Sequence, residues 1–453
     1  MTVRVLVRPG RYYDSVTLMA ISQRLRALPG VERASVAMGT PLNLQQIAES
    51  FGAAVTATPG DVVVAVAAAS EADCEAAVAA AEQELSGRAQ PAGTGGRRAA
   101  PRSVAAALRG GFAADLALVS VPGEYAAREA RLALEQGLDV MLFSNNVPVA
   151  DEVRLKRLAL EQGRLLMGPD CGTAILNGVG LGFANAIRPG NIGIVAASGT
   201  GAQELSCLID RLGGGVSQLI GVGGRDLSEA VGGLMTLEAI RRLQADPGTE
   251  RIVVVSKPPG HSVAERVAAA LEAPGGKPYA LCLLDRFSLD EAAEAATGCT
   301  LAFGDHVAVG RARGPRALGL FTGGTLCSQA RQILGDRAEL IDLGEDRFTQ
   351  GRPHPMIDPS YRAELLRDCR ADLVLLDVVL GHGAHPDPAG ALASAMRAAA
   401  AAGTVIVASV TGTEADPQGY SRQAAALREA GAAVAPTARL AALAAKEALA
   451  RRW

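Results

Sequence analysis

Residues 190–205 read GNIGIVAASGTGAQEL, an apolar run that ends in a turn of small residues and continues into helix-forming sequence. The run 192–195 is typical of a buried strand, and Ser198 stands where a helix should begin. A related stretch, LFTGGT at 320–325, follows a second short apolar run. Strands that alternate with helices in this way predict a parallel α/β layer, and the pattern occurs twice.

Further features after residue 190 recur at a near-constant offset. Thr325 follows Thr200 by 125 residues, and Gly344 follows Gly223 by 121 residues. Two other pairs share this spacing, namely Gly260-His261 with Gly381-His382 and the predicted strands 252–256 with 373–377. A constant offset across separate features indicates an internal repeat. We therefore expect two related α/β domains, at 189–314 and 315–453.

The first 188 residues also alternate predicted strands with predicted helices. The apolar runs stand at 3–7, 61–67, 115–121 and 139–143. This spacing predicts a parallel sheet with right-handed crossovers in an N-terminal domain over 1–188. Residues 87–102 are rich in glycine, proline, alanine and arginine, which is typical of a flexible linker.

Composition limits the class of protein. The chain has 453 residues, 49% of them hydrophobic, which fits about three α/β domains. The formal charge of −3 comes from 44 basic and 47 acidic residues, so no large basic field is available to hold nucleic acid. We expect no signal peptide and no membrane span. The seven cysteines are odd in number and form no CxxC pair, which predicts reduced cytoplasmic thiols and no metal site.

Two turns carry the main indication of an anion site. Backbone N–H groups at a helix start are unpaired and carry partial positive charge, and glycine lets the backbone approach an anion closely. The residues concerned are Ser198, Gly199 and Thr200 in the first copy and Gly323, Gly324 and Thr325 in the second. Two helix starts that converge on one phosphate would suit an acyl-phosphate intermediate. Ordinary N-cap and turn chemistry selects the same residues, so both interpretations stay open.

Other ionisable residues follow predicted strands, where ligands of open α/β sheets bind. Arg225, after the glycine loop Gly223-Gly224, is suited to hold a phosphate or carboxylate with two hydrogen bonds. Lys257 ends an apolar strand and is placed for an anion. The alternatives are a plain turn with an exposed Arg225–Asp226 pair and a solvent-facing lysine.

The remaining candidates include two histidines. His382 could act as acid, base or phosphoryl carrier. The stretch GRPHPMIDP at 351–359 has three prolines that fix the backbone, and we interpret it as displaying Arg352, His354 and Asp358 toward a ligand. A rigid crossover between domains is the alternative.

Several of these motifs resemble known proteins. GPDCGT (168–173), GNIGIVAASGTGAQEL (190–205) and GVGG (221–224) are similar to the α-subunit of succinyl-CoA synthetase, and IDLGED (341–346) with DVVLGHGA (377–384) resembles the CoA-ligase domain of its β-subunit. Nearly the whole chain resembles the FdrA family, through RYYDSVTLMAISQRL (11–25), VAMGTPLN (36–43), SVPGEYAAREA (120–130), GRPHPMIDP (351–359) and VTGTEADPQ (410–418).

The resemblance implies a three-domain, succinyl-CoA synthetase-like α/β fold. A Rossmann-like CoA-binding domain, with Gly10, Pro122 and Glu124 on the cofactor CoA, would precede two flavodoxin-like CoA-ligase domains. The chain departs from succinyl-CoA synthetase at two places. The loop after the predicted strand 278–284 has no histidine to carry a phosphoryl group, and Ser256-Lys257-Pro258-Pro259 stands where the family has Glu-Ile-Gly-Gly, so the family glutamate is missing. An enzyme that receives a ready-made acyl phosphate needs no such carrier.

For the FdrA family the resemblance implies a subunit of oxamate carbamoyltransferase in allantoin catabolism. This enzyme converts oxamate and carbamoyl phosphate to oxalurate and phosphate together with partner subunits, and Arg225 or Arg352 would hold the oxamate carboxylate. The expected catalytic residues are Arg225, Lys257, Arg352 and His382, with Gly223, Gly224, His354 and Asp358 as substrate-binding residues. The alternatives are an NDP-forming acyl-CoA synthetase and a non-catalytic CoA-binding regulatory subunit. We expect a cytoplasmic protein that acts on small molecules, as part of a hetero-oligomer or as a homodimer.

Overall fold

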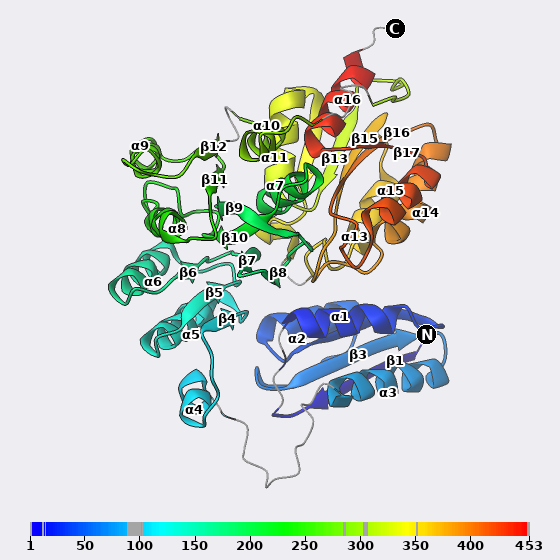
Figure 1. Cartoon of the computed structure of the whole chain (residues 1–453). Helices are drawn as coiled ribbons and strands as arrows, with labels where there is room; N and C mark the ends of the chain where they lie inside the picture. The colour runs from blue at the N-terminus through cyan, green and yellow to red at the C-terminus, as the bar shows by residue number, and fades with distance from the viewer. Residues whose placement is uncertain are drawn as a thin grey trace. The chain divides into compact units, whose positions relative to one another are not determined.

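The structure is a computed structural model that describes residues 2–10, 13, 15–87, 101, 103–283, 287–301, 307–349 and 352–450 (Figure 1). The chain divides into two compact units. The first unit comprises residues 1–111 with 350–353, and the second comprises residues 112–349 with 354–453. The predicted linker 87–102 lies almost entirely outside the described residues. None of the helices in the described ranges is long and apolar enough to span a membrane.

The first unit is a three-stranded sheet with helices on both faces. Its elements are β1 (Thr2–Arg8), α1 (Ser15–Arg26), β2 (Val31–Met38), α2 (Pro41–Phe51), β3 (Val62–Ala68), α3 (Glu71–Gly87) and α4 (Val104–Arg109). All seven residues of β3 are buried. Residues of α1 and α3 pack on one face of this strand and residues of α2 on the other, so its sequence is apolar throughout rather than alternating.

This sheet differs from the parallel sheet that the sequence predicts for 1–188. β3 lies between β1 and β2 and pairs antiparallel with both. β1 and β2 therefore run in the same direction, but β3 separates them. Strands and helices alternate along the sequence in the same way in both arrangements, so the expectation of one parallel sheet is wrong for residues 2–87. The first compact unit ends at residue 111.

The second unit opens with a small parallel sheet of order β4-β5-β6. Its elements are β4 (Leu116–Val119), α5 (Gly123–Glu135), β5 (Asp139–Leu142), α6 (Val149–Glu161) and β6 (Leu166–Met167). The parallel pairing predicted for this part of the chain is confirmed.

A six-stranded sheet follows, of order β12-β11-β9-β10-β7-β8. Its elements are β7 (Thr173–Leu176), β8 (Val179–Gly182), β9 (Pro189–Ala196), α7 (Gly199–Arg211), β10 (Val216–Gly221), α8 (Leu234–Ala245), β11 (Arg251–Ser256), α9 (His261–Leu271), β12 (Tyr279–Leu283) and α10 (Leu289–Thr297). The strands β9 to β12 pair in parallel, whereas β7 pairs antiparallel with β10 and β8.

The last part of the chain forms a five-stranded parallel sheet of order β14-β13-β15-β16-β17. Its elements are β13 (Ala317–Phe321), α11 (Gly324–Leu334), β14 (Ala338–Asp342), α12 (Asp346–Thr349), α13 (Ser360–Asp368), β15 (Leu373–Val379), α14 (Pro388–Ala401), β16 (Val405–Thr411), α15 (Tyr420–Glu429), β17 (Ala432–Ala435) and α16 (Ala438–Ala450), with a 3-10 turn at Gly335–Arg337. The order β16-β15-β13-β14 matches β12-β11-β9-β10 strand for strand, so the internal repeat read from the sequence is present in the topology.

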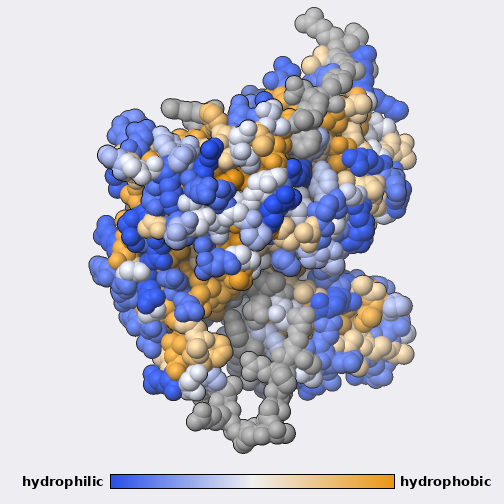
Figure 2. Space-filling view, viewed as in Figure 1, coloured by the Kyte–Doolittle hydropathy of each residue, from blue (hydrophilic) through white to orange (hydrophobic). Residues whose placement is uncertain are grey.

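Apolar side chains are buried mainly between the sheets and the helices that pack on them. Figure 2 shows mainly hydrophilic residues on the visible face, broken by smaller apolar patches. The large apolar side chains exposed among the described residues are Phe112, Leu118, Tyr125, Val149, Val179, Tyr279 and Phe287.

Candidate functional site

Helix α7 begins directly after β9, at the turn that the sequence singles out. Ser198 is its N-cap residue, with extended backbone angles, and its hydroxyl accepts a hydrogen bond from the Gly201 amide at 3.0 Å. This is the ordinary capping role of serine, and it satisfies one of the free N–H groups of the first turn. The capping interpretation of Ser198 is therefore correct, whatever else the residue does.

Helix α11 begins at the matching place after β13, but without such a cap. Gly323 is its N-cap residue and provides no side chain to accept from the first turn. The start of α11 therefore keeps the partial positive charge of its free N–H groups.

The two helix starts meet. The hydroxyls of Ser198 and Thr325 are hydrogen-bonded to each other. A Cβ placed on Gly201 would lie 2.9 Å from Cγ2 of Thr325, and one placed on Gly323 would overlap the side chain of Thr200. The structure thus brings together residues of both predicted phosphate-binding turns, although phosphate binding itself remains a prediction.

Thr200 has a second property that bears on ligand binding. The residue is 8% exposed, and its hydroxyl has no hydrogen-bond partner among the described residues. The Thr200 hydroxyl is therefore open to a hydrogen bond with a ligand or with water.

Lys257 and Asp342 lie beside the start of α11. Lys257 follows β11, and Asp342 ends β14. A Cβ placed on Gly324 would lie 3.1 Å from the Lys257 Nζ and 2.6 Å from the Asp342 Oδ2. The Gly344 amide donates to the Asp342 Oδ1 at 2.9 Å. Burial raises the pKa of Asp342 to about 6, against the opposing effects of the Gly344 hydrogen bond and the Lys257 charge.

Sequence reasoning includes Lys257 but misses Asp342. The available signal was the position of Asp342 in the sequence. It is an acidic residue at the end of a strand, on the edge of the sheet where ligands of α/β folds bind.

A buried ion pair holds the turn before α11. The carboxylate of Asp377, in β15, accepts from the Thr322 amide at 2.9 Å and from the Thr322 hydroxyl at 2.8 Å. Arg362, on α13, pairs with the same carboxylate at 2.9 Å. Both charged side chains are almost fully buried. The sequence reasoning also missed Arg362 and Asp377; the available signal was the charge of Asp377 within an apolar strand.

His354 lies near this cluster. A Cβ placed on Gly344 would lie 2.8 Å from the His354 Nε2 and 3.1 Å from the Asp342 Oδ1. The Met356 amide donates to the His354 Nδ1 at 3.3 Å, so the neutral ring carries its proton on Nε2. Burial lowers the pKa of His354 to about 4, and the ring is therefore neutral at neutral pH.

The other residues predicted around His354 have separate contacts. Asp358 accepts from the Ser360 amide at 3.0 Å, at the start of α13. The His382 side chain is exposed, and its amide donates to the Ala184 carbonyl at 2.8 Å. Arg352 belongs to the segment 350–353, which is part of the first unit.

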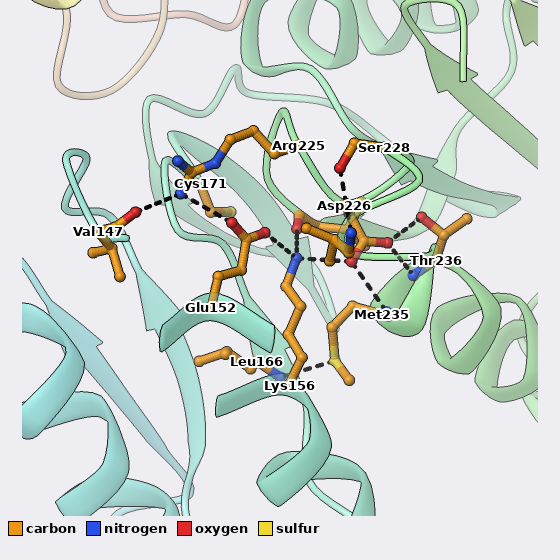
Figure 3. A network of polar contacts seen from close by, with 12 residues as sticks. Val147, Glu152, Lys156, Leu166, Cys171, Arg225, Asp226, Ser228, Met235 and Thr236 are labelled. Carbon is orange, nitrogen blue, oxygen red and sulfur yellow. Dashed lines mark hydrogen bonds and ion pairs between the residues drawn. The ribbon is translucent and has the colours of Figure 1, made fainter. Parts of the chain in front are cut away.

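Arg225 lies in a polar network with a buried lysine at its centre (Figure 3). Lys156 is fully buried and its Nζ donates to Glu152 at 2.8 Å, to Asp226 at 2.7 Å and to the Val222 carbonyl at 3.0 Å. The Arg225 guanidinium lies 2.9 Å from the other Glu152 oxygen. The predicted pair of Arg225 with Asp226 is therefore replaced by an ion pair with Glu152.

In the glycine loop before Arg225, Gly223 is tightly packed and Gly224 is exposed. Gly223 has φ of +87°, and a Cβ on it would overlap the Pro169 carbonyl. For Gly224 the nearest atom to such a Cβ is an Asp170 oxygen at 3.8 Å. Local packing and the positive φ explain why residue 223 is a glycine. Substrate binding by Gly223 and Gly224 stays a prediction.

The three residues expected to bind CoA belong to different compact units, and their role stays a prediction. Gly10 lies in the first unit and donates its amide to Asp61 at 3.0 Å. Pro122 and Glu124 flank the start of α5 in the second unit. A Cβ on Gly123 would overlap the Asn145 carbonyl and lie 2.7 Å from that of Asn146, so a side chain does not fit at this position.

Three family models match the chain. An AllF, heavy metal-associated domain matches residues 1–101, a CoA binding domain matches 187–281, and a CoA-ligase matches 320–448. The CoA binding domain therefore covers β9 to β12, not the three residues discussed above.

The name of the first model implies a metal that residues 1–101 do not fit. This stretch contains one cysteine, Cys74, and no histidine. The Cys74 thiol is buried and donates to the Thr2 carbonyl at 3.2 Å. Among all the residues that the structure describes, no group of three or more His, Cys, Asp or Glu is arranged to hold a metal ion.

Individual proteins also match the chain. The uncharacterized protein YahF of Escherichia coli (strain K12) is 40% identical over 99% of this chain and 98% of its own length. The succinate–CoA ligase [ADP-forming] subunit alpha 2 of Archaeoglobus fulgidus is 30% identical over 34% of this chain, and the match spans about half of that relative, 54%. Among solved structures, PH0766 from Pyrococcus horikoshii OT3 matches 74% of this chain and 83% of its own, with 17% identity and a TM-score of 0.31.

The fold with its parallel sheets, the CoA binding domain and the CoA-ligase domain agree with the resemblance to a succinyl-CoA synthetase-like family of the FdrA or AllF type. Since the match to YahF runs through almost all of both proteins, the chain belongs to the YahF family of succinyl-CoA synthetase-like proteins.

Proposed function

We propose that the second unit binds the phosphoryl group of an acyl phosphate at the starts of α7 and α11 and transfers the acyl group to a second substrate. The observation that carries this proposal is the meeting of two helix starts beside the Lys257 ammonium. Two partial positive charges and one full positive charge favour a phosphate group. The unpartnered Thr200 hydroxyl is available to donate to one of its oxygens.

These groups favour the transfer step as well as binding. When the acyl carbon is attacked, negative charge develops on the oxygen that leaves with phosphorus. Fixed N–H groups and Lys257 stabilise that charge without reorganisation, and this stabilisation lowers the barrier. The buried pair of Arg362 and Asp377 keeps the turn at 322–324 in position for this role.

For the substrates, we propose carbamoyl phosphate and oxamate, with partner subunits completing the enzyme. This choice is supported by the resemblance to the FdrA family and by the sequence 284–288, which has no histidine to relay a phosphoryl group from a nucleotide. With Lys257 beside the phosphate, the Nε2–H of His354 is a donor near the turn before α11 that suits the oxamate carboxylate. CoA is proposed only as an alternative acyl acceptor.

A second candidate is an NDP-forming acid–thiol ligase. It is supported by the CoA binding and CoA-ligase matches and by the Archaeoglobus fulgidus relative. This candidate requires a phosphorylated side chain, so it predicts radiolabel on the protein after incubation with labelled ATP. It also predicts thioester formation from CoA.

The test uses the full chain, produced together with the proteins encoded beside it. Carbamoyl phosphate and oxamate are supplied, and phosphate and oxalurate are followed by NMR; a parallel reaction contains CoA, succinate and labelled ATP. We expect oxalurate only in the first reaction, and about a tenfold lower rate for Thr200→Val, since one hydrogen bond to a charged group is lost. Thr404→Val is the matched control, because its hydroxyl bonds only the Ala371 carbonyl. Failure of inorganic phosphate to bind, together with full activity of Thr200→Val, would contradict the proposal.

A further inference from the structure

We infer that Asp342 is the general base of the acyl-transfer step, the group that takes the proton from the attacking nucleophile. This inference rests on the proposed function and extends it to a residue that neither the sequence reasoning nor the comparisons single out. The Asp342 carboxylate lies at the same helix start that would hold the phosphate.

The two carboxylate oxygens of Asp342 have different surroundings. Oδ1 is fixed by the Gly344 amide at 2.9 Å. Oδ2 lies 2.6 Å from the Cβ position of Gly324 and has no hydrogen-bond partner among the described residues. One oxygen thus anchors the side chain, while the other faces the first residue of α11 and is available to a substrate. Asp342 itself is only partly buried, so a ligand can reach it.

The chemistry of acyl transfer requires such a group. The nucleophile, an amide nitrogen or a thiol, forms a bond to the acyl carbon, and the bond from that carbon to the phosphate oxygen breaks. The electron pair of the broken bond leaves with phosphate, and the proton of the nucleophile must go to a base. In the inferred step that proton passes to the Asp342 Oδ2, and from there to the departing phosphate or to water.

The neighbouring charged groups are less suited to this task. Lys257 carries positive charge for the phosphate. His354 has its Nδ1 lone pair engaged by the Met356 amide, so the ring offers a donor rather than an acceptor. Asp377 is buried and paired with Arg362, and Glu345 is exposed and paired with Arg347 at 2.8 Å.

The electrostatic setting of Asp342 agrees with a base that works near neutral pH. Burial raises its pKa to about 6, and the charges of Asp377 and Glu345 act in the same direction. The Gly344 amide and Lys257 oppose the rise. A base whose pKa lies near the working pH combines a large ionised fraction with sufficient basicity.

The experiment compares Asp342→Asn with wild type in the full chain and its co-produced partners, between pH 5 and pH 9. For wild type we expect the rate of carbamoyl transfer to rise with pH and to level off with a midpoint near 6. For Asp342→Asn we expect the rate at pH 8 to fall by about 100-fold or more and the midpoint to disappear. Binding of inorganic phosphate should be unchanged or tighter, since a negative charge is removed. Glu345→Gln is the matched control: it should keep the rate at pH 8 and retain a midpoint, moved somewhat lower because the Glu345 charge raises the pKa of Asp342.

Asp342→Glu provides a second check against simple misfolding. It should retain a measurable rate and an acidic limb in the pH profile, because it still carries a base. An Asp342→Asn protein with a wild-type rate and pH profile would overturn the inference while leaving the proposed function intact. Absence of phosphate binding and of acyl transfer in wild type would overturn the proposed function, and the inference with it.

Discussion

At the scale of single residues, Asp290 is a carboxyl group held where water has little access. It lies in the first turn of α10 and is 7% exposed. Its Oδ2 accepts from the Thr437 hydroxyl at 3.4 Å, and its Oδ1 has no partner among the described residues. Burial, followed by the nearby Glu204, raises the pKa of Asp290 to about 7. The folded protein therefore favours the protonated form.

This shift makes stability depend on pH. An acid whose pKa is higher in the folded state adds stability below its unfolded pKa, and that stability is lost as pH rises through the folded value. From pH 4 to pH 8 we expect Asp290 to remove up to roughly 4 kcal/mol from the free energy of unfolding. Asp290→Asn, which cannot ionise, should be more stable than wild type at pH 8 and equal to it near pH 4. Urea unfolding across this range measures the difference.

The neighbouring Glu291 is a control of opposite sign. It forms a capping box with Ser288, and the hydrogen bonds from the Ser288 amide and hydroxyl lower its pKa. Its contribution is therefore present above its unfolded pKa and lost as pH falls. Glu291→Gln should lose stability at pH 8 rather than gain it. An Asp290→Asn protein that follows the wild-type pH curve would show that Asp290 ionises freely in the folded state.

At the scale of elements, the closest approach in the candidate site is between the starts of α7 and α11. A methyl group at residue 323 would overlap Thr200, whereas one at residue 199 would meet only the Thr173 hydroxyl at 3.8 Å. We expect Gly323→Ala to cost about 1–3 kcal/mol, the usual range for overpacking. Gly199→Ala, at the matching helix start, should be neutral. Thermal unfolding and phosphate affinity measure both effects.

The same contact predicts a non-additive double variant. Thr200→Ala removes two of the three atoms that a methyl at residue 323 would overlap. Adding Thr200→Ala to Gly323→Ala should therefore recover part of the lost stability, whereas independent sites would simply add. Additive losses would show that the two helix starts are not in contact in solution.

Local features explain which elements could be predicted from the sequence. The run 192–195 and the turn at Ser198 lie within one short stretch, so β9 and the start of α7 are readable from it, and the repeat offset extends the same prediction to β13 and α11. The insertion of β3 between β1 and β2 has no local signal, because the order of strands in a sheet is a tertiary property. The sequence therefore predicted parallel pairing correctly for β4 to β6 and for β9 to β17, and wrongly for the sheet of the first unit.

The same reasoning separates the site residues. The glycine turns and Lys257 were found because each stands at the end of an apolar strand. Asp342 approaches Gly324 only after β14 and β13 pair. Arg225 is held by Glu152, which lies on α6, far earlier in the chain. Such partners come from different elements, so no spacing in the sequence indicates them.

At the scale of the whole molecule, buried and part-buried polar contacts join the last sheet of the second unit to the preceding part of that unit. Asp416 accepts from the Asn185 side chain at 2.8 Å and from the Ala186 amide at 2.7 Å. Arg211, on α7, donates to the Pro436 carbonyl at 2.6 Å, and its guanidinium lies over the Tyr420 ring at 4.3 Å. Separating these parts would expose the polar groups to water or leave them without hydrogen-bond partners. We therefore expect the second unit to unfold as one cooperative body.

The first unit has its own apolar cores around β3 and is expected to unfold separately. Calorimetry of the full chain should therefore show two transitions.

Two variants assign the transitions to the units. Ser22→Ala removes a buried hydroxyl that accepts from the Val36 amide at 2.7 Å. It should lower only the transition of the first unit, by several degrees for a loss of about 1 kcal/mol. Asp416→Ala should lower only the other transition, because its partners Asn185 and Ala186 lie within the second unit. A single transition shifted by both variants would mean that the two units are energetically coupled, in which case ligand binding at the α7 and α11 starts would also stabilise the first unit.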